Sequence, residues 1–256
     1  MTTATLLKVL LLNLLLIPLS GFVSAQEIKP EATEDWSNKP PVVTPGKAGA
    51  PPSDAIVLFS GKRDLDKWEG IEGAPVKWEA NDETLQIVKK AKDIQTKQKF
   101  GSIQLHLEWK TPGPEEDKGT SRGNSGVLLM GLYEVQIYES YDYKTRLYYN
   151  GIAASIYKQY APLVNACLPP QTWQVYDIIF EAPVFSDDKT LKIPAYVTLL
   201  HNGVLVQNHV SIKGPMIYAG YPAYQYHENK LPLRLQEHDS RVSFRNIWLR
   251  ELTSPQ

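Results

Sequence analysis

The chain has 256 residues, of which 27 are Lys or Arg and 28 are Asp or Glu, so its formal net charge is −1. Its basic residues are spread along the chain, whereas nucleic-acid-binding proteins concentrate them on one face, so we expect no nucleic-acid partner. The length suits one folded domain with a sizeable core. The single cysteine, Cys167, excludes an intrachain disulfide, and we interpret it as a small buried apolar residue.

Residues 1–25 have the pattern of a secretory signal peptide. Lys8 supplies a short positive region, residues 9–23 are almost wholly apolar, and the Val-Ser-Ala sequence at 23–25 provides small residues for cleavage. The alternative is an uncleaved membrane anchor, but the apolar run is interrupted and shorter than the roughly 20 residues that a span needs. We therefore predict an exported protein, periplasmic or extracellular, with no stable membrane span after cleavage.

Residues 26–54 are rich in proline and show no apolar periodicity, which predicts an extended, flexible linker. The folded domain is predicted to cover residues 55–253, and it begins with the apolar run at 56–59. The sequence carries no signal from which the oligomeric state can be predicted.

The predicted domain consists of short segments of alternating hydrophobicity. Residues 102–109 (SIQLHLEW) alternate without a break, which is typical of a half-buried strand. Asn202-Gly203 predicts a tight hairpin turn. Further strands are predicted at 85–88, 126–130, 133–138, 153–157, 173–180, 195–201, 204–209, 233–236 and 242–249. Because no segment keeps a helical period for three turns, the fold class is predicted to be all-β, a sandwich or jelly roll.

The densest polar cluster is the segment YEVQIYE at 133–139. Glu134 and Gln136 lie two residues apart, so they share one face of a strand, and Glu139 joins them only if the strand has a bulge. Two carboxylates that flank an amide suit acid–base work on a glycosidic bond. The alternative is a solvated strand face with ordinary surface glutamates.

Two further segments add polar groups to this region. The glycine-containing loop at 121–126 could hold Arg122 and Asn124 at the rim of a site, or form a tight turn with a solvated arginine. On the strand at 233–238, Arg234, Gln236 and His238 share one face, and His238 could carry a proton or bind a metal.

Three other residues are candidates from their positions in predicted strands. Glu108 shares a strand face with His106, and His201 ends a strand at the hairpin turn. Asp177 interrupts an apolar strand, so it must be paired, hydrogen-bonded or functional with a raised pKa. Each histidine alone is more often an ordinary hydrogen-bonded residue than a ligand, and no spacing defines a metal site.

Taken in order, several segments resemble the 3-keto-disaccharide hydrolase family over residues 56–252. They are FSGK at 59–62, LHLEW at 105–109, RGNSG at 122–126, YEVQI at 133–137, PLVNAC at 162–167, WQVYDI at 173–178, LHNG at 200–203, LRLQ at 233–236 with His238, and RNIW at 245–248. The resemblance implies a concanavalin-like jelly roll of two antiparallel sheets and an enzyme, a hydrolase or lyase, that cleaves 3-keto-glycosides.

The same architecture occurs in laminarinase-type glucanases, whose signature is Glu-x-Asp-x-x-Glu. Glu134-x-Gln136-x-x-Glu139 is similar to it, with Gln where Asp would stand, which weakens the case for ordinary retaining hydrolysis. Two residues depart from the pattern of the keto-sugar family. Leu168 stands where a basic residue is expected and Lys158 where glycine is expected, and both could alter substrate choice.

The resemblance implies chemistry at a C3 ketone, which acidifies the C2 proton and allows elimination followed by hydration. Glu134 or His238 would be the base and Glu108 or Glu139 the acid. Arg122 would stabilise the enolate oxygen, unless a divalent metal replaces it; no other cofactor is expected. Contacts to the saccharide substrate would come from Arg122, Asn124, Gln136, Asp177, His201 and Gln236. A non-catalytic carbohydrate-binding module and a conventional β-glucanase remain alternatives.

Overall fold

The computed structural model describes residues 28–37, 39–116, 122–143 and 147–252, and the predicted signal peptide at 1–25 lies outside them. One unit of the chain ends at Val42 and a second begins at Val43. In the first unit, the described residues include a short 3-10 helix, η1 (Pro30–Thr33). Nowhere in the described ranges is there a helix of the length and hydropathy that crossing a membrane would need.

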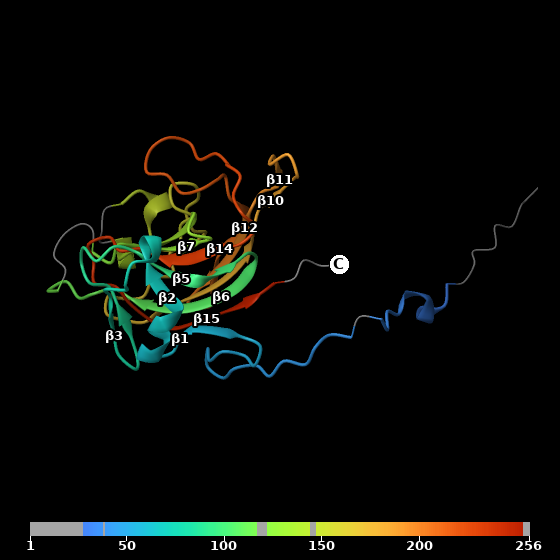
Figure 1. Cartoon of the computed structure of the whole chain (residues 1–256), viewed down its shortest axis with the longest axis horizontal. Helices are drawn as coiled ribbons and strands as arrows, with labels where there is room; N and C mark the ends of the chain where they lie inside the picture. The colour runs from blue at the N-terminus through green and yellow to red at the C-terminus, as the bar shows by residue number, and fades with distance from the viewer. Residues whose placement is uncertain (1–27, 38, 117–121, 144–146, 253–256) are drawn as a thin grey trace, which may run out of the picture. The chain divides into compact units, whose positions relative to one another are not determined.

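The second unit is a β-sandwich of two antiparallel sheets (Figure 1). The order of the eight-stranded sheet is β13-β12-β9-β6-β15-β4-β3, and β1 pairs with β15. Its strands are β1 (Ile56–Phe59), β3 (Glu79–Ala80), β4 (Leu85–Gln86), β6 (Ile103–Lys110), β9 (Gln174–Glu181), β12 (Tyr196–His201), β13 (Val204–Ser211) and β15 (Ser243–Glu251).

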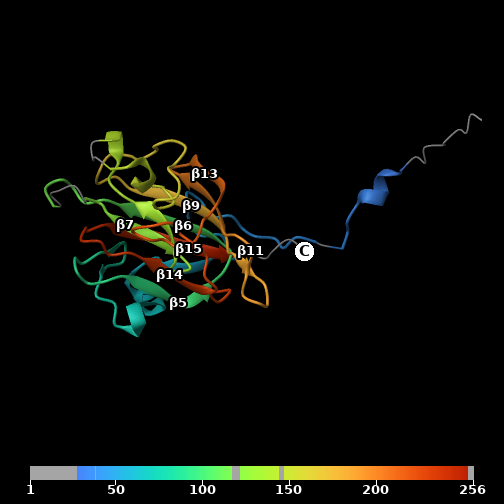
Figure 2. The same cartoon turned by 90° about the horizontal axis from the view of Figure 1, so that it is seen from above.

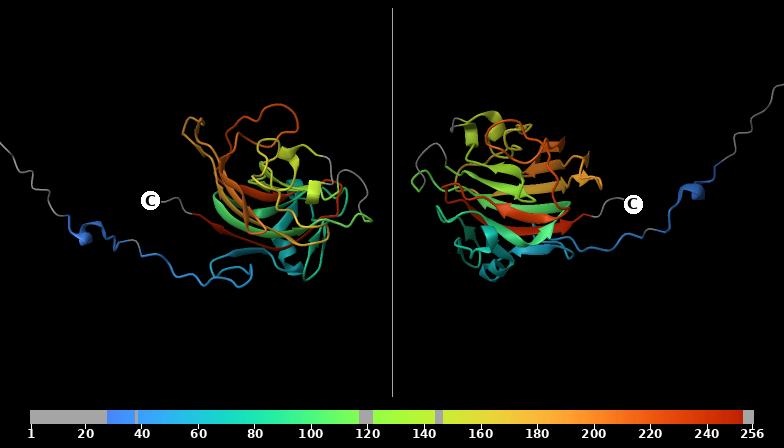
Figure 3. Two further views of the ribbon diagram at one scale, coloured as in Figure 1. Left: turned by 180° about the vertical axis from the view of Figure 1, so that it is seen from behind. Right: turned by 45° about the horizontal axis from the view of Figure 1, so that its top comes forward.

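The five-stranded sheet has the order β2-β5-β14-β7-β8. Its strands are β2 (Trp68–Gly70), β5 (Ile94–Phe100), β7 (Ser125–Leu129), β8 (Tyr133–Ile137) and β14 (Leu231–Leu235). The remaining described elements are the hairpin β10 (Val184–Phe185) and β11 (Leu191–Ile193), and the 3-10 helices η2 (Lys62–Lys67), η3 (Ile71–Gly73), η4 (Tyr141–Tyr143) and η5 (Tyr149–Gly151). The strand arrows of the two sheets are also visible from above and from a tilted view (Figures 2 and 3).

The core lies between the two sheets because each sheet turns every second side chain inward. In β6 the inward residues are Ile103, Leu105, Leu107 and Trp109, as the alternation predicts, and all are at most 2 % exposed. From the other sheet, β7, β8 and β14 contribute Val127, Val135, Ile137, Leu233 and Leu235 to the same core. Burial of each large apolar side chain contributes about 1.5–3 kcal/mol. The predicted jelly-roll sandwich of two antiparallel sheets is therefore confirmed.

Most predicted strands are present, with ends shifted by a few residues, and the hairpin turn is confirmed. Asn202 and Gly203 have φ of 53° and 78°, the left-handed pair that a tight turn between β12 and β13 needs. The predicted strand at 153–157 is wrong: Ile156 makes only isolated bridges there, and left-handed angles at Ala154 and Lys158 turn the chain. Strand β5 is not among the predicted strands, because its sequence contains a run of polar residues.

The last part of the predicted linker packs on the outer face of the eight-stranded sheet. The carbonyl oxygen of Gly49 accepts hydrogen bonds from Trp248 Nε1 at 3.0 Å and from Asn246 Nδ2 at 2.9 Å. Asp54 forms an ion pair with Arg250 at 2.6 Å. Residues from Val43 onward therefore belong to the same compact unit as the sandwich.

Candidate active site

A cavity of about 420 Å³ lies over β7, β8 and β14, on the face of the five-stranded sheet that points away from the core. The strand register explains which side chains reach the cavity, because paired residues lie on the same face of a sheet. Leu128 pairs with both Arg234 and Glu134, and Gly126 pairs with Gln136. The neighbouring positions on these strands face the core instead. The lining residues are Asn124, Glu134, Gln136, Tyr138, Leu147, Tyr148, Gly151, Tyr157, Met216, Tyr218, Gln236 and His238.

Glu134 is the buried carboxyl group of this cavity, with 3 % of the residue exposed. Its side chain lies against Gly126, where a Cβ atom would come within 2.5 Å of Glu134 Oε1, so only glycine leaves room for it. Within the described parts of the chain, no hydrogen bond or ion pair to the carboxyl group is found. Burial, with a smaller contribution from the charge of Asp93, raises the pKa of Glu134 to about 8.

Gln136, Asn124 and His238 form a hydrogen-bonded chain along the cavity wall. Gln136 Nε2 donates to Asn124 Oδ1 at 2.9 Å and to the carbonyl oxygen of Ile137 at 3.0 Å. Asn124 Nδ2 lies 3.0 Å from His238 Nδ1. Gln136 Oε1 is buried and has no partner in the described ranges, so it can accept a hydrogen bond from a ligand.

Tyrosine side chains also line the cavity. The backbone of residues 154–157 hydrogen-bonds to the free edge of β8, which brings Tyr157 next to Glu134. Tyr148 Oη donates to Tyr157 Oη at 2.9 Å. Lys158 Nζ donates to the carbonyl oxygen of Tyr218 at 2.5 Å and lies 4.1 Å from the centre of its ring, so it ties two loops of the wall together.

Asn124, Glu134, Gln136, Gln236 and His238 are the sequence candidates that the fold brings together in this cavity. Glu139 does not line it: its carboxyl group accepts hydrogen bonds from Thr111 Oγ1 and from the backbone N–H of Tyr141, both at 3.0 Å. Arg122 does not line the cavity either. Its positive charge acts on Tyr138, which is one of the lining residues.

His201 lies in the core, 1 % exposed, and not in the cavity. Its ring stacks on Trp109 at 5.7 Å, and Nε2 lies 3.1 Å from Gln174 Oε1. Burial lowers the pKa of His201 to about 4, so the ring is neutral at physiological pH. Cys167 is buried as predicted, and burial raises the pKa of its thiol to about 11.

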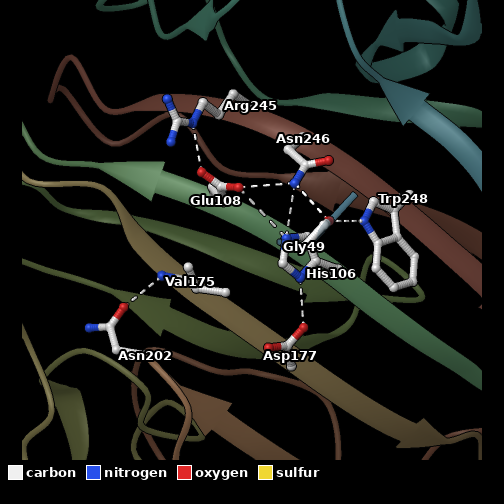
Figure 4. A network of polar contacts seen from close by, with 9 residues as sticks. All are labelled: Gly49, His106, Glu108, Val175, Asp177, Asn202, Arg245, Asn246 and Trp248. Carbon is white, nitrogen blue, oxygen red and sulfur yellow. Dashed lines mark hydrogen bonds and ion pairs between the residues drawn. The ribbon is translucent and has the colours of Figure 1, made fainter. Parts of the chain in front are cut away.

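Glu108 and Asp177 belong to a second polar cluster, on the outer face of the eight-stranded sheet (Figure 4). Asp177 Oδ1 pairs with His106 Nδ1 at 2.6 Å, which confirms that this carboxylate in an apolar strand has a partner. Glu108 accepts hydrogen bonds from Arg245 Nε at 2.6 Å and from Asn246 Nδ2 at 2.9 Å. The sandwich core separates this cluster from the Glu134 cavity, so the two carboxylates do not join Glu134.

Sequence reasoning did not identify all the groups that shape the cavity. Asp93 precedes β5 and accepts a hydrogen bond from the backbone N–H of Glu237 at 2.9 Å, and burial raises its pKa. It lies in a loop, where no periodicity marks it. Tyr148, Tyr157 and Tyr218 also come from loops, and none of them is among the sequence candidates. In the described ranges, no group of three or more His, Cys, Asp or Glu residues could hold a metal ion.

Comparisons with known proteins agree with this architecture. Residues 54–250 match the 3-keto-alpha-glucoside-1,2-lyase-like domain. The crystal structure of a presumed glycosyl hydrolase from Parabacteroides distasonis ATCC 8503 is 45% identical, covers 88% of this chain and 97% of its own, and has a TM-score of 0.80. A second from the same organism is 21% identical over 78% of this chain and 94% of its own, with a TM-score of 0.57, which shows the fold alone.

No curated protein matches the chain. The family match covers most of the sequence and all but the last residue of the sandwich. The chain therefore belongs to the 3-keto-alpha-glucoside-1,2-lyase-like domain family, and its function is of the glycoside-hydrolase type.

Proposed function

We propose that the protein cleaves the glycosidic bond of 3-keto-glycosides, with Glu134 as the base that removes the C2 proton. One observation carries this proposal: in a cavity of sugar-sized volume, the buried carboxyl group of Glu134 has a pKa of about 8 and no partner among the described residues. A base is most effective when its pKa lies near the working pH. A proton next to a ketone is weakly acidic, so a carboxylate of raised basicity suits its removal.

The reaction would proceed in three steps. Glu134 takes the proton from C2, and the electrons of that bond form an enolate with the C3 carbonyl. The enolate then expels the C1 substituent as an alcohol, and His238, which lines the same cavity, donates a proton to the departing oxygen. Water then adds to the C1=C2 bond: its oxygen bonds to C1 as His238 Nε2 takes one of its protons, and Glu134, after exchange with solvent, delivers a proton to C2, which gives the free 3-keto sugar and restores both groups.

The carboxylate count of the cavity favours this route over conventional glycoside hydrolysis. Retaining and inverting glycosidases both use a pair of carboxyl groups that flank the bond. Among the described lining residues, Glu134 is the sole carboxyl group, because Glu139 and Glu108 lie elsewhere.

The remaining wall supplies groups that suit a sugar ring. Gln136 Oε1 is a buried acceptor to which a sugar hydroxyl can donate a hydrogen bond. The rings of Tyr138, Tyr148, Tyr157 and Tyr218 offer surfaces on which apolar sugar faces pack. Lys158 occupies a left-handed backbone position with φ of 56°, which agrees with the glycine expected there. Its side chain fixes the Tyr218 wall, so this departure would affect how the substrate is held.

We also propose that the protein is exported, and its support is the signal-peptide pattern of residues 1–25. Expression of the full chain with fractionation of the cells would test this. The proposal predicts a mature protein that starts after Ala25 outside the cytoplasm, and an unprocessed cytoplasmic chain would contradict it.

The catalytic proposal is tested with a 3-keto-glucoside and the corresponding unoxidised glucoside. The wild-type protein should cleave only the keto substrate. Glu134→Gln and His238→Ala should each lower kcat by about 10²–10⁴-fold, while Gln98→Glu, a change at an exposed position, should leave it unchanged. Cleavage of the unoxidised glucoside would favour a conventional glycosidase. Binding of the sugar without cleavage would favour a carbohydrate-binding module.

A further inference from the structure

The orientation of the Gln136 amide is fixed by the backbone. The carbonyl oxygen of Ile137 can only accept a hydrogen bond, so the end of the amide that faces it at 3.0 Å must be the NH₂ group. The second hydrogen of this NH₂ group points to Asn124 at 2.9 Å. A reversed amide would place Oε1 against the carbonyl oxygen of Ile137 and lose that hydrogen bond, which contributes about 0.5–1.5 kcal/mol.

The orientation of Asn124 follows from that of Gln136. Since Gln136 donates, the atom of Asn124 that receives the hydrogen bond is Oδ1. The NH₂ group of Asn124 then faces His238 Nδ1 at 3.0 Å. An amide nitrogen has no lone pair to accept a hydrogen bond, so Nδ1 must accept and carries no proton. The proton of the neutral imidazole ring is left on Nε2.

We propose that Gln136 is a positioning residue that acts through Asn124 and holds His238 in the form that carries its proton on Nε2. The position of the proton follows from the three side chains and the Ile137 carbonyl alone. Its use rests on the proposed function, in which His238 donates this proton to the leaving alcohol from Nε2. No hydrogen bond to Nε2 is found in the described parts of the chain, which leaves that nitrogen available to a substrate.

Other charged and titratable groups surround His238. Asp93 acts electrostatically on His238, Glu237 and Arg234. Glu134, Tyr138 and Tyr148 line the same cavity as His238. A proton on Nδ1 would face the NH₂ group of Asn124, so among the two neutral forms the amide chain selects the one that carries its proton on Nε2.

A carboxylate at position 136 would exchange the donors and acceptors in the hydrogen bonds that link residue 136, Asn124 and His238. Glutamate can only accept hydrogen bonds, so Asn124 would turn its NH₂ group toward residue 136 and its Oδ1 toward His238. The ring would then carry its proton on Nδ1. Asn124→Asp produces the same reversal by a second route, because its carboxylate accepts from both Gln136 Nε2 and His238 Nδ1–H. The two variants change charge with almost no change in volume.

The test is ¹⁵N NMR of the His238 ring nitrogens in histidine-labelled full-length protein at a pH at which the ring is neutral, with His238→Gln to assign the signals. Wild type and the exposed-site control Gln98→Glu should show a protonated Nε2 and a bare Nδ1. Gln136→Glu and Asn124→Asp should show the reverse. A wild-type proton on Nδ1, or unchanged tautomers in both carboxylate variants, would overturn the proposal.

Kinetics with the 3-keto-glucoside separate this inference from the proposed function. If both hold, Gln136→Glu lowers kcat by about 10²-fold or more with a smaller change in KM, because the donated proton is misplaced. Glu134→Gln should lower kcat by about 10²–10⁴-fold with the wild-type tautomer retained. If wild type shows the Nε2 proton but cleaves no keto-glycoside, the proposed function fails and the positioning by Gln136 stands. A reversed tautomer in Gln136→Glu with undiminished kcat would overturn the role of the Nε2 proton.

Discussion

The carboxyl group of Glu134 lies against Gly126 on the neighbouring strand, so closely that a Cβ atom at residue 126 would be 2.5 Å from Oε1 and 3.0 Å from Cδ. The two residues sit on adjacent strands of one sheet, β8 and β7, and Glu134 lines the cavity. Because Gly126 has no side chain, the carboxyl group of Glu134 can occupy the space beside it.

Gly126→Ala should therefore displace the Glu134 carboxyl group and lower kcat about 10²-fold, because a shift of about 1 Å in a reacting group has an effect of that size. Steady-state kinetics with a 3-keto-glucoside measure it. Gly61→Ala is the matched control, since Gly61 is extended with φ of 165° and its added Cβ would make ordinary contacts at 3.4 Å or more. Equal activity of both variants would contradict the placement of Glu134.

Glu134→Gln should stabilise the protein, and the gain should grow with pH. The pKa of Glu134 is about 8 in the folded protein and ordinarily 4.5, so between these values the unfolded chain releases a proton that the native protein retains. Wild-type stability therefore falls as pH rises through this window, by about 1.4 kcal/mol per unit of pKa shift. Urea unfolding at pH 5, 6.5 and 8 measures the difference, and a gain that does not depend on pH would contradict the raised pKa.

The pH dependence of the reaction should show the same group. If Glu134 acts as a base, only its ionised form is active, and kcat/KM should rise with pH and level off above about 8. A profile measured between pH 5 and pH 9 tests this. Activity that is maximal at pH 5–6 and falls toward pH 8 would instead indicate that Glu134 acts as an acid.

Lys158→Met should raise KM about 3–10-fold with a smaller change in kcat. The variant loses the hydrogen bond to the carbonyl oxygen of Tyr218 and the contact with its ring, each worth about 1 kcal/mol, and with them the tie between two walls of the cavity. Lys213→Met is the control, because Lys213 lies over Tyr160, which does not line the cavity. Equal KM values in the two variants would exclude the role of Lys158.

Glu108→Gln tests whether the second polar cluster takes part in catalysis. Glu108 is held by Arg245 and Asn246 on the far face of the sandwich, so its loss should lower the free energy of unfolding by about 1–2 kcal/mol. Turnover should stay within about twofold of wild type, since the cluster does not touch the cavity. A loss of turnover comparable with that of Glu134→Gln would restore Glu108 as the acid.

The sequence predicts the sandwich well because alternation is a local property. The apolar residues of β6 face the core, as the alternation predicts, and the Asn202-Gly203 turn needs no tertiary information. Glu134, Gln136 and Gln236 were likewise placed on polar strand faces. Which polar faces meet depends on strand order, and alternation cannot tell the two outer faces apart. For that reason Glu108 and Asp177 were grouped with Glu134, from which the core separates them.

Loop residues were beyond reach for a different reason. Tyr157 reaches Glu134 because the backbone at 154–157 binds the free edge of β8, and the same residues had been predicted as a strand. Asp93 acts on Glu134 through space, from a loop that precedes β5. Neither position has a sequence period, so only the folded chain shows that they belong to the site.

In the proposed mechanism, cleavage begins when Glu134 removes the C2 proton, and the reaction in D₂O tests this step. A 3-keto-glucoside labelled with ordinary hydrogen at C2 is cleaved to an early time point, and the product is analysed by NMR or mass spectrometry, with Glu134→Gln as the background for spontaneous exchange. If Glu134 removes the C2 proton, the newly released keto sugar should carry one deuterium at C2. Release of a product that retains its original C2 hydrogen would contradict it.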